Sequence, residues 1–142
     1  MSNSDAVAGS GREHSAVILL VEDEVLIRLS IAEPLRESGF AVLEAGNASE
    51  AIALASTGHA VDLAITDVRM PGGIDGVALS FTLKDIHPAL PIILISGDMS
   101  PDREHRGDGF LRKPFELSQL MNLVTQLMDP AWLNKRQTRN VS

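Results

Sequence analysis

Residues 16–24 have the sequence Ala-Val-Ile-Leu-Leu-Val-Glu-Asp-Glu, and this stretch decides the fold class. Its first six residues form a continuous apolar run rich in branched side chains, which is typical of a strand that is covered on both faces. The run is far too short to cross a membrane. Three acidic residues, Glu22, Asp23 and Glu24, follow it directly. The stretch therefore predicts a buried parallel strand with acidic side chains at its carboxyl end.

Apolar segments and helical patterns alternate along the rest of the chain. Further short strands are predicted over residues 40–45, 60–66, 91–96 and 110–111. Helices are predicted between and after them, over residues 25–38, 48–56, 77–86 and from 117 to about 129. This alternation is typical of an α/β protein, in which a doubly wound, five-stranded parallel sheet carries helices on both faces.

The two ends of the chain differ in composition from this body. Residues 1–15 are rich in Ser, Gly, Ala and Asp and lack a hydrophobic signal core, so they are predicted to form a disordered leader. Residues 16–129 form the single predicted domain. Residues 130–142 are predicted to be a short C-terminal tail, too short for another domain.

Composition excludes several classes of function. The chain has 142 residues, of which 44% are hydrophobic, and its 12 Lys and Arg against 19 Asp and Glu give a net charge of −7. An acidic surface repels phosphate backbones, which argues against direct binding of nucleic acid. Cysteine is absent, and this excludes disulfides, zinc-thiolate sites, iron–sulfur clusters and thiol nucleophiles. We therefore expect a cytoplasmic protein with no membrane insertion.

Polar side chains stand at the carboxyl ends of four predicted strands. Glu22 and Asp23 end the first strand, Asp67 follows the third, Ser96 ends the fourth and Lys113 follows the fifth. In a parallel sheet of this type the functional crevice lies outside the carboxyl ends of the strands. These five side chains are therefore expected to converge on one edge of the sheet.

Carboxylates gathered at one point repel each other, so a cation is expected to offset their charge. Mg²⁺ suits this role because it prefers oxygen ligands and usually keeps several waters. Asp23 and Asp67 are the candidate direct ligands, with Glu22 acting through a water and Lys113 as a nearby cation. A carboxylate in this setting is well placed to accept a phosphoryl group, and Ser96 can donate its hydroxyl to a phosphoryl oxygen.

Four segments carry a resemblance to a known family. They are Leu20-Val-Glu-Asp-Glu24, Asp62-Leu-Ala-Ile-Thr-Asp-Val-Arg-Met-Pro-Gly72, Ile93-Leu-Ile-Ser-Gly97 and Phe110-Leu-Arg-Lys-Pro-Phe115. In this order and spacing they resemble the receiver domain of bacterial two-component response regulators, which has a flavodoxin-like fold. The resemblance implies a regulatory protein rather than an enzyme. It implies that a histidine kinase or histidine phosphotransfer protein phosphorylates Asp67, next to the acidic pair Glu22 and Asp23.

The resemblance also implies roles for neighbouring residues. The backbone carbonyl of Arg69 would be a further Mg²⁺ ligand, and the Lys113–Pro114 bond would be cis. Ser96 would be the switch hydroxyl, coupled to the aromatic ring of Phe110 by steric contact. Positions two residues past the phosphoacceptor and the switch hydroxyl influence phosphoryl lifetime in the family. We hypothesise that the residues there, Arg69 and Asp98, pair across the mouth of the site and control the entry of water.

Two features depart from the family pattern. The loop Met70–Gly76 looks one residue longer than usual. Only residues 97–112, sixteen in all, separate Ser96 from Lys113, and this segment contains Gly107 and Gly109. The fourth helix of the fold is therefore expected to be short, distorted or missing.

With no output domain attached, a stand-alone receiver is expected. It would switch a protein-interaction surface towards an unknown downstream protein target, with a homodimer possible, or act as a phosphoryl shuttle or sink.

Other functions were weighed against this interpretation. A phosphatase or phosphotransferase of the haloacid-dehalogenase type also combines Asp, Ser or Thr, Lys and Mg²⁺, but it places an Asp-x-Asp nucleophile where this chain has Glu22-Asp23-Glu24. A flavin-binding module would need a phosphate-cradling loop there, and three acids would repel the phosphate. A degenerate receiver that binds partners without phosphorylation is favoured by the altered segment after Ser96 and opposed by the intact set of five polar residues.

Overall fold

The computed structural model describes residues 15–70, 72–97 and 104–128 of the chain. Five strands form one parallel sheet in the order β3-β2-β4-β5-β6. They are β2 (Val17–Val21), β3 (Ala41–Ala45), β4 (Leu63–Asp67), β5 (Ile92–Ser96) and β6 (Gly109–Arg112). The predicted five-stranded parallel sheet is confirmed. The predicted leader, apart from Ser15, and the predicted tail lie outside the described residues.

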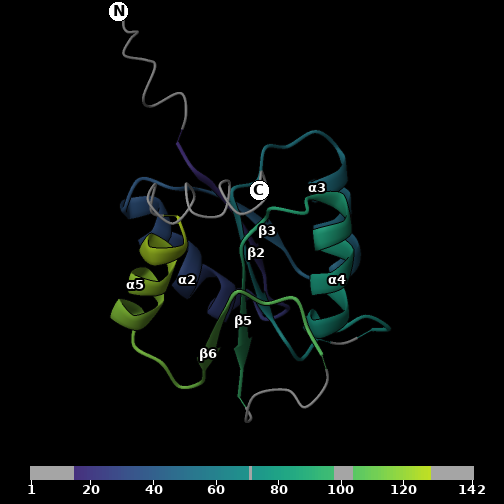
Figure 1. Ribbon diagram of the computed structural model, residues 1–142. Helices are drawn as coiled ribbons and strands as arrows, with labels where there is room; N and C mark the ends of the chain where they lie inside the picture. The colour runs from purple at the N-terminus through teal and green to yellow at the C-terminus, as the bar shows by residue number, and fades with distance from the viewer. Residues whose placement is uncertain (1–14, 71, 98–103, 129–142) are drawn as a thin grey trace, which may run out of the picture.

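Helices cover both faces of the sheet (Figure 1). On one face, α2 (Val25–Glu37) and α5 (Leu117–Leu127) close one hydrophobic cluster. On the other face, α3 (Ala48–Ser56) and α4 (Gly76–Ile86) close a second one. The fold is therefore doubly wound, as the alternation of strands and helices predicted. No helix in the described part of the chain is long and apolar enough to cross a bilayer.

Burial on both faces explains why the strands are continuously apolar. In β2, Ile18 and Leu20 pack towards α2 and α5, while Leu19 and Val21 pack towards α3 and α4. Side chains alternate between the faces of a strand, so a strand covered on both sides needs apolar residues at every position. All five residues of β4 are buried, including the polar Thr66 and Asp67 at its end.

The end of β4 differs from the sequence prediction. The strand was predicted over residues 60–66, with Asp67 beyond it, but it begins at Leu63 and includes Asp67. Asp62 remains outside because its exposed carboxylate accepts a hydrogen bond from the Val17 N–H at 2.8 Å. Asp67 belongs to the strand because it pairs in register with Ile95 of β5. The main chain of Asp67 is thus held by the sheet itself.

Side chains cap the two helices on the α3 and α4 face where they begin. Asn47 accepts a hydrogen bond from the Glu50 N–H at 2.8 Å, which is one half of a capping box. The Glu50 carboxylate, however, accepts from the Gly46 N–H rather than from Asn47. Asp75 caps α4 by accepting from the Ala78 N–H at 2.9 Å.

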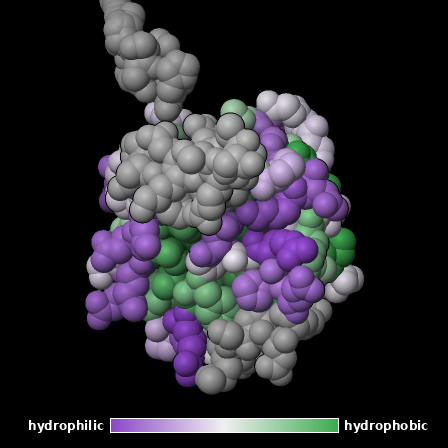
Figure 2. Space-filling view, in the orientation of Figure 1, coloured by the Kyte–Doolittle hydropathy of each residue, from purple (hydrophilic) through white to green (hydrophobic). Residues whose placement is uncertain are grey.

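The connection from β5 to β6 departs from the helical connections elsewhere in the fold. Of its residues, the structure describes Gly97 and 104–108, and none of these lies in a helix. We call residues 104–108 the crossover segment. It lies against α4, where the Arg106 N–H donates to the buried Ser80 hydroxyl at 3.0 Å and the Lys84 ammonium donates to Asp108 at 2.9 Å. Figure 2 shows hydrophilic side chains gathered over this segment and α4.

Candidate functional site

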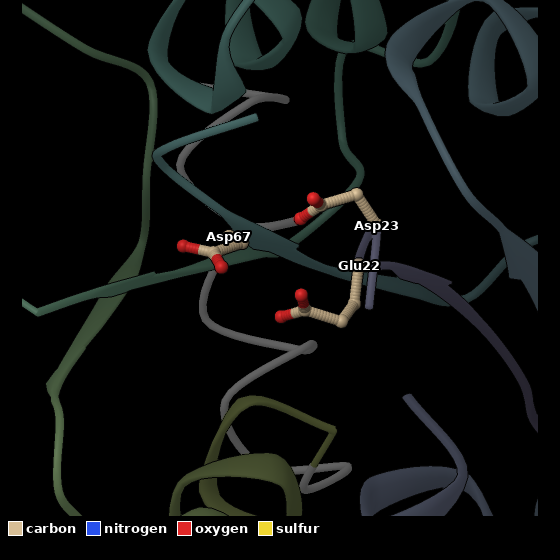
Figure 3. A group of neighbouring side chains, drawn as sticks. All are labelled: Glu22, Asp23 and Asp67. Atoms are coloured by element: carbon tan, nitrogen blue, oxygen red, sulfur yellow. The ribbon is translucent and has the colours of Figure 1, made fainter. Parts of the chain in front are cut away.

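Three carboxylates meet where the strand order reverses. β2 lies between β3 and β4, so the carboxyl ends of β2 and β4 are adjacent and the connections leave them on opposite sides. Glu22 and Asp23 follow β2, and Asp67 ends β4. One carboxylate oxygen of each residue lies within 4.8 Å of the other two. Figure 3 shows the three side chains around one common space.

Glu22 is the buried member of this pair of β2 acids. It is 3% exposed, and one carboxylate oxygen accepts a hydrogen bond from the Glu24 N–H at 3.1 Å. Burial raises the pKa of Glu22 to about 7, a rise that the Glu24 N–H reduces and the neighbouring Asp67 carboxylate increases. Glu22 is therefore protonated for part of the time near neutral pH, whereas Asp23 is exposed to solvent.

Lys113 lies on the other side of Asp67. Its ammonium donates to Asp67 Oδ2 at 2.9 Å and stands 3.9 Å from Glu22 Oε1. Burial works against the charged form of Lys113, but the hydrogen bond and charge of Asp67, together with Glu22, raise its pKa. The Lys113–Pro114 bond is cis, as the resemblance implied. The Lys113 N–H also donates to the Ser96 carbonyl at 2.7 Å, which ties the lysine to the end of β5.

Ser96 and Phe110 lie on one face of the sheet. Ser96 is 6% exposed and follows Leu94 by two residues, so both side chains point to the α3 and α4 side. Phe110 pairs in register with Leu94 and packs in the same cluster. Its ring centroid lies 6.5 Å from that of His105 in the crossover segment. The predicted switch pair thus occupies neighbouring strands beside the crossover segment.

The residues named for phosphoryl lifetime are only partly described. Arg69 is exposed, and its backbone N–H donates to Asp67 Oδ1 at 3.3 Å. Asp98 lies outside the described residues. The pairing of Arg69 with Asp98 therefore stays a prediction.

Two hollows at the surface border residues of the site. One, of about 630 Å³, is bordered by Asp23, by the start of α3 and by the loop before α4. The other, of about 560 Å³, is bordered by Lys113, Pro114 and apolar side chains of α2 and of the start of α5. One hollow thus borders the exposed carboxylate of the site, and the other borders its lysine.

The donor set fits a hard divalent cation. All three side chains offer carboxylate oxygens, which Mg²⁺ prefers, and the exposed Asp23 leaves room for the waters that Mg²⁺ usually keeps. The ammonium of Lys113 neutralises only one charge of the cluster. A negatively charged pocket that is lined by carboxylate oxygens and has one ammonium group beside it is suited to binding a metal ion and an anion together.

Comparison with known proteins decides the family. A family model for the response regulator receiver domain matches residues 18–125. This chain belongs to the response regulator receiver family. The resemblance in the sequence and the predicted flavodoxin-like fold are both confirmed.

Relatives of this receiver are found in longer regulatory proteins. It is 39% identical over 115 residues to the transcriptional regulatory protein PdtaR of Mycobacterium tuberculosis, across 75% of this chain and 54% of that protein. It is 35% identical over 124 residues to the sensor kinase CckA of Brucella abortus, across 81% of this chain and 13% of that protein. The chain thus spans about half, or much less, of the length of these relatives.

A solved structure shares both fold and sequence with this receiver. It is the crystal structure of the response regulator protein TrrA from Thermotoga maritima in complex with Mg(2+)-BeF. The TM-score is 0.72 at 30% identity, and the match covers 79% of this chain and 98% of that one.

Two residues beside the receiver site were missed by sequence reasoning. Gly76 donates its N–H to the Val68 carbonyl at 2.8 Å, and a Cβ at this position would overlap the Asp67 carbonyl oxygen at 2.1 Å. Arg28 donates from Nη1 to the Glu22 carbonyl at 2.7 Å. Neither contact follows from sequence spacing, because each depends on how a helix packs against the end of a strand.

Proposed function

We propose that this receiver accepts a phosphoryl group on Asp67 from a phosphohistidine of a partner histidine kinase or histidine phosphotransfer protein. The observation that carries the proposal is the placement of the Asp67 carboxylate between the β2 acids and the Lys113 ammonium. In the transfer, an Asp67 carboxylate oxygen forms a bond to phosphorus while the phosphorus–nitrogen bond of the donor breaks. The imidazole leaves with the electron pair and takes up a proton.

The transfer depends on neutralising charge more than on acid–base chemistry. Mg²⁺, held by Asp23, Asp67 and the Arg69 carbonyl with Glu22 acting through a water, would offset the charge of the phosphoryl oxygens. Lys113 supplies the second positive charge, and its ammonium donates a hydrogen bond to the Asp67 carboxylate. Ser96, on the neighbouring strand, would donate its hydroxyl to a phosphoryl oxygen.

The signal would leave through the α4 side of the sheet. A shift of Ser96 towards the phosphoryl group would open space on the face where Phe110 packs, and the phenylalanine ring would fill it. Because Phe110 neighbours His105, such a movement would reach the crossover segment. That surface would then be presented to a downstream protein, and a long phosphoryl lifetime would favour this role over a phosphoryl shuttle or sink.

The haloacid-dehalogenase alternative places its nucleophile after the first strand. In this receiver the corresponding positions are Glu22 and Glu24, and Glu22 has a pKa of about 7 that leaves it partly protonated. Asp67, with Lys113 donating to it, is the better acceptor.

Incubation with Mg²⁺ and acetyl phosphate, followed by intact-mass measurement, tests the proposal. One phosphoryl adduct is expected in the wild-type chain and none in Asp67→Asn. Asp62→Asn is the matched control. Asp62 is an exposed carboxylate just before the amino end of β4, whereas Asp67 stands at its carboxyl end, so this variant should still form the adduct. An adduct that persists in Asp67→Asn, or repeated turnover of phosphate esters, would contradict the proposal.

A further inference from the structure

Arg28 holds the peptide that joins the two β2 acids. Its Nη1 donates to the Glu22 carbonyl at 2.7 Å. A peptide unit is planar, so the Glu22 carbonyl and the Asp23 N–H turn together. Fixing this carbonyl therefore fixes the direction in which the chain enters Asp23.

The Arg28 guanidinium is itself anchored. Its Nε donates to Glu44 Oε1 of β3 at 3.0 Å, and its side chain is 17% exposed. Arg36, which lies eight residues further along α2, pairs with the other oxygen of Glu44 at 2.9 Å.

Two further hydrogen bonds act on the same end of β2. The Glu22 N–H donates to the Ala45 carbonyl at 3.0 Å, and the Glu24 N–H donates to the Glu22 carboxylate at 3.1 Å. Together with Arg28 they hold the N–H, the carbonyl and the side chain of Glu22. Of these three contacts, only the one from Arg28 restrains the plane of the peptide that joins Glu22 to Asp23.

We propose that Arg28 is a positioning residue for the divalent-cation site, which it serves by holding the Glu22–Asp23 peptide in the orientation that turns Asp23 towards Asp67. The inference rests on the proposed function, since it assumes that Asp23 and Asp67 hold Mg²⁺. Groups that orient metal ligands without touching the metal commonly contribute 10- to 100-fold to metal affinity. Arg28 contacts backbone rather than a ligand side chain, so the lower end of this range is expected.

The test is Mg²⁺ titration of the full, unphosphorylated chain by NMR, with the wild type measured beside Arg28→Gln and Arg28→Lys. Both variants are expected to bind Mg²⁺ about tenfold more weakly. Lysine keeps the charge but cannot form the two-pronged contact with Glu22 and Glu44, so a purely electrostatic role for Arg28 would leave Arg28→Lys unchanged.

Arg36→Gln is the matched control. Arg36 lies on the same helix and pairs with the same Glu44, but its other hydrogen bond goes to the Val42 carbonyl rather than to Glu22. Urea unfolding should show similar losses of stability for Arg28→Gln and Arg36→Gln, while only the Arg28 variants lose Mg²⁺ affinity. An equal loss of affinity in both would reduce Arg28 to a structural residue.

The outcomes separate this inference from the proposed function. Wild-type affinity in Arg28→Gln overturns the positioning role and leaves the phosphoacceptor proposal standing. A wild-type chain that does not bind Mg²⁺ overturns both.

Discussion

Asp67 is restrained at its side chain and at its backbone. Lys113 and the Arg69 N–H hold the two carboxylate oxygens, and the strand pairing with β5 holds the main chain. A carboxylate that is only 6% exposed needs such partners, because burial of an unpaired charge is costly. The start of α4 completes the arrangement by lying directly against the Asp67 carbonyl.

Gly76→Ala should disturb this packing. The added Cβ would meet the Asp67 carbonyl oxygen at 2.1 Å and the Val68 Cα at 2.8 Å, both of which are backbone atoms. We expect the free energy of unfolding to fall by about 1–3 kcal/mol, as in overpacked cores, and phosphorylation by acetyl phosphate to slow. Chemical denaturation followed by circular dichroism, together with intact-mass time courses, measures both effects.

Gly73→Ala provides the control for this change. Gly73 lies in the same loop, and no atom lies within 4 Å of a Cβ built there. Stability and phosphorylation should therefore remain close to wild type. If Gly76→Ala behaved like Gly73→Ala, the close approach of α4 to Asp67 would be wrong.

Glu44 should make stability depend on pH. Partial burial opposes its ionisation, but the hydrogen bonds and charges of Arg28 and Arg36 outweigh burial and lower its pKa. A carboxyl whose pKa is lower in the folded state stabilises the fold above its unfolded pKa and loses that contribution as pH falls through its folded pKa.

Glu44→Gln measures this contribution. At pH 7 the variant should unfold more easily, by a fraction of a kcal/mol up to about 1 kcal/mol, as for partly exposed ion pairs. The difference from wild type should shrink as pH falls below the ordinary glutamate range. Urea unfolding at several pH values tests this, and a difference that stays constant with pH would argue against the ion-pair explanation.

At the scale of elements, the crossover segment lies where the sequence predicted a short, distorted or missing helix, and its described residues 104–108 form no helix. The carboxylate of Asp108 accepts hydrogen bonds from the buried Ile92 N–H and from Lys84, both at 2.9 Å. The Arg106 guanidinium lies 4.7 Å from the centre of the Phe81 ring. These contacts anchor the segment to β5 and α4.

Asp108→Ala should therefore destabilise the fold. The Ile92 N–H would be left without its partner in a buried position, at a cost of about 1–3 kcal/mol. Glu104→Ala is the control, because the Glu104 side chain is 74% exposed and pairs with Arg106 two residues away. Thermal unfolding should separate the two variants, and equal melting temperatures would contradict the anchoring role of Asp108.

Sequence patterns predicted the elements well where local signals were strong. The helix over residues 48–56 has the predicted bounds because Asn47 supplies a local cap. The edge on which Glu22, Asp23 and Asp67 meet could be predicted because parallel strands bring their carboxyl ends together. The course of the crossover segment could not, since its contacts join residues 16 to 26 positions apart.

Parts of the site depend on packing that no short pattern encodes. Gly76 closes a turn-rich loop in the sequence, and nothing there indicates that it lies against Asp67. Arg28 falls on the polar side of an amphipathic helix, where a solvated arginine is the ordinary expectation. The proposed role of Arg28 depends on Glu44, which lies 16 positions further along the chain, on strand β3.

For the whole molecule, the carboxylates of the cluster repel one another, and a bound cation would reduce this repulsion. The chain carries a net charge of −7, and three of its carboxylates meet at one point with one lysine among them. Such clusters lower the stability of a fold in exchange for function. Removal of one acid should therefore raise stability in the absence of metal and remove the response to metal.

Asp23→Asn tests both expectations, the higher stability without metal and the lost response to metal. In metal-free buffer the variant should melt at a higher temperature than wild type, because one repelling charge is gone. Mg²⁺ at 100 times its Kd should stabilise the wild type by about 2.7 kcal/mol, and it should leave Asp23→Asn nearly unchanged. Because a chain of net charge −7 responds to any added salt, ionic strength must be kept constant with NaCl. Asp62→Asn, altered at the opposite edge, should keep the full Mg²⁺ response, and an equal response in Asp23→Asn would place the cation away from the carboxylate cluster.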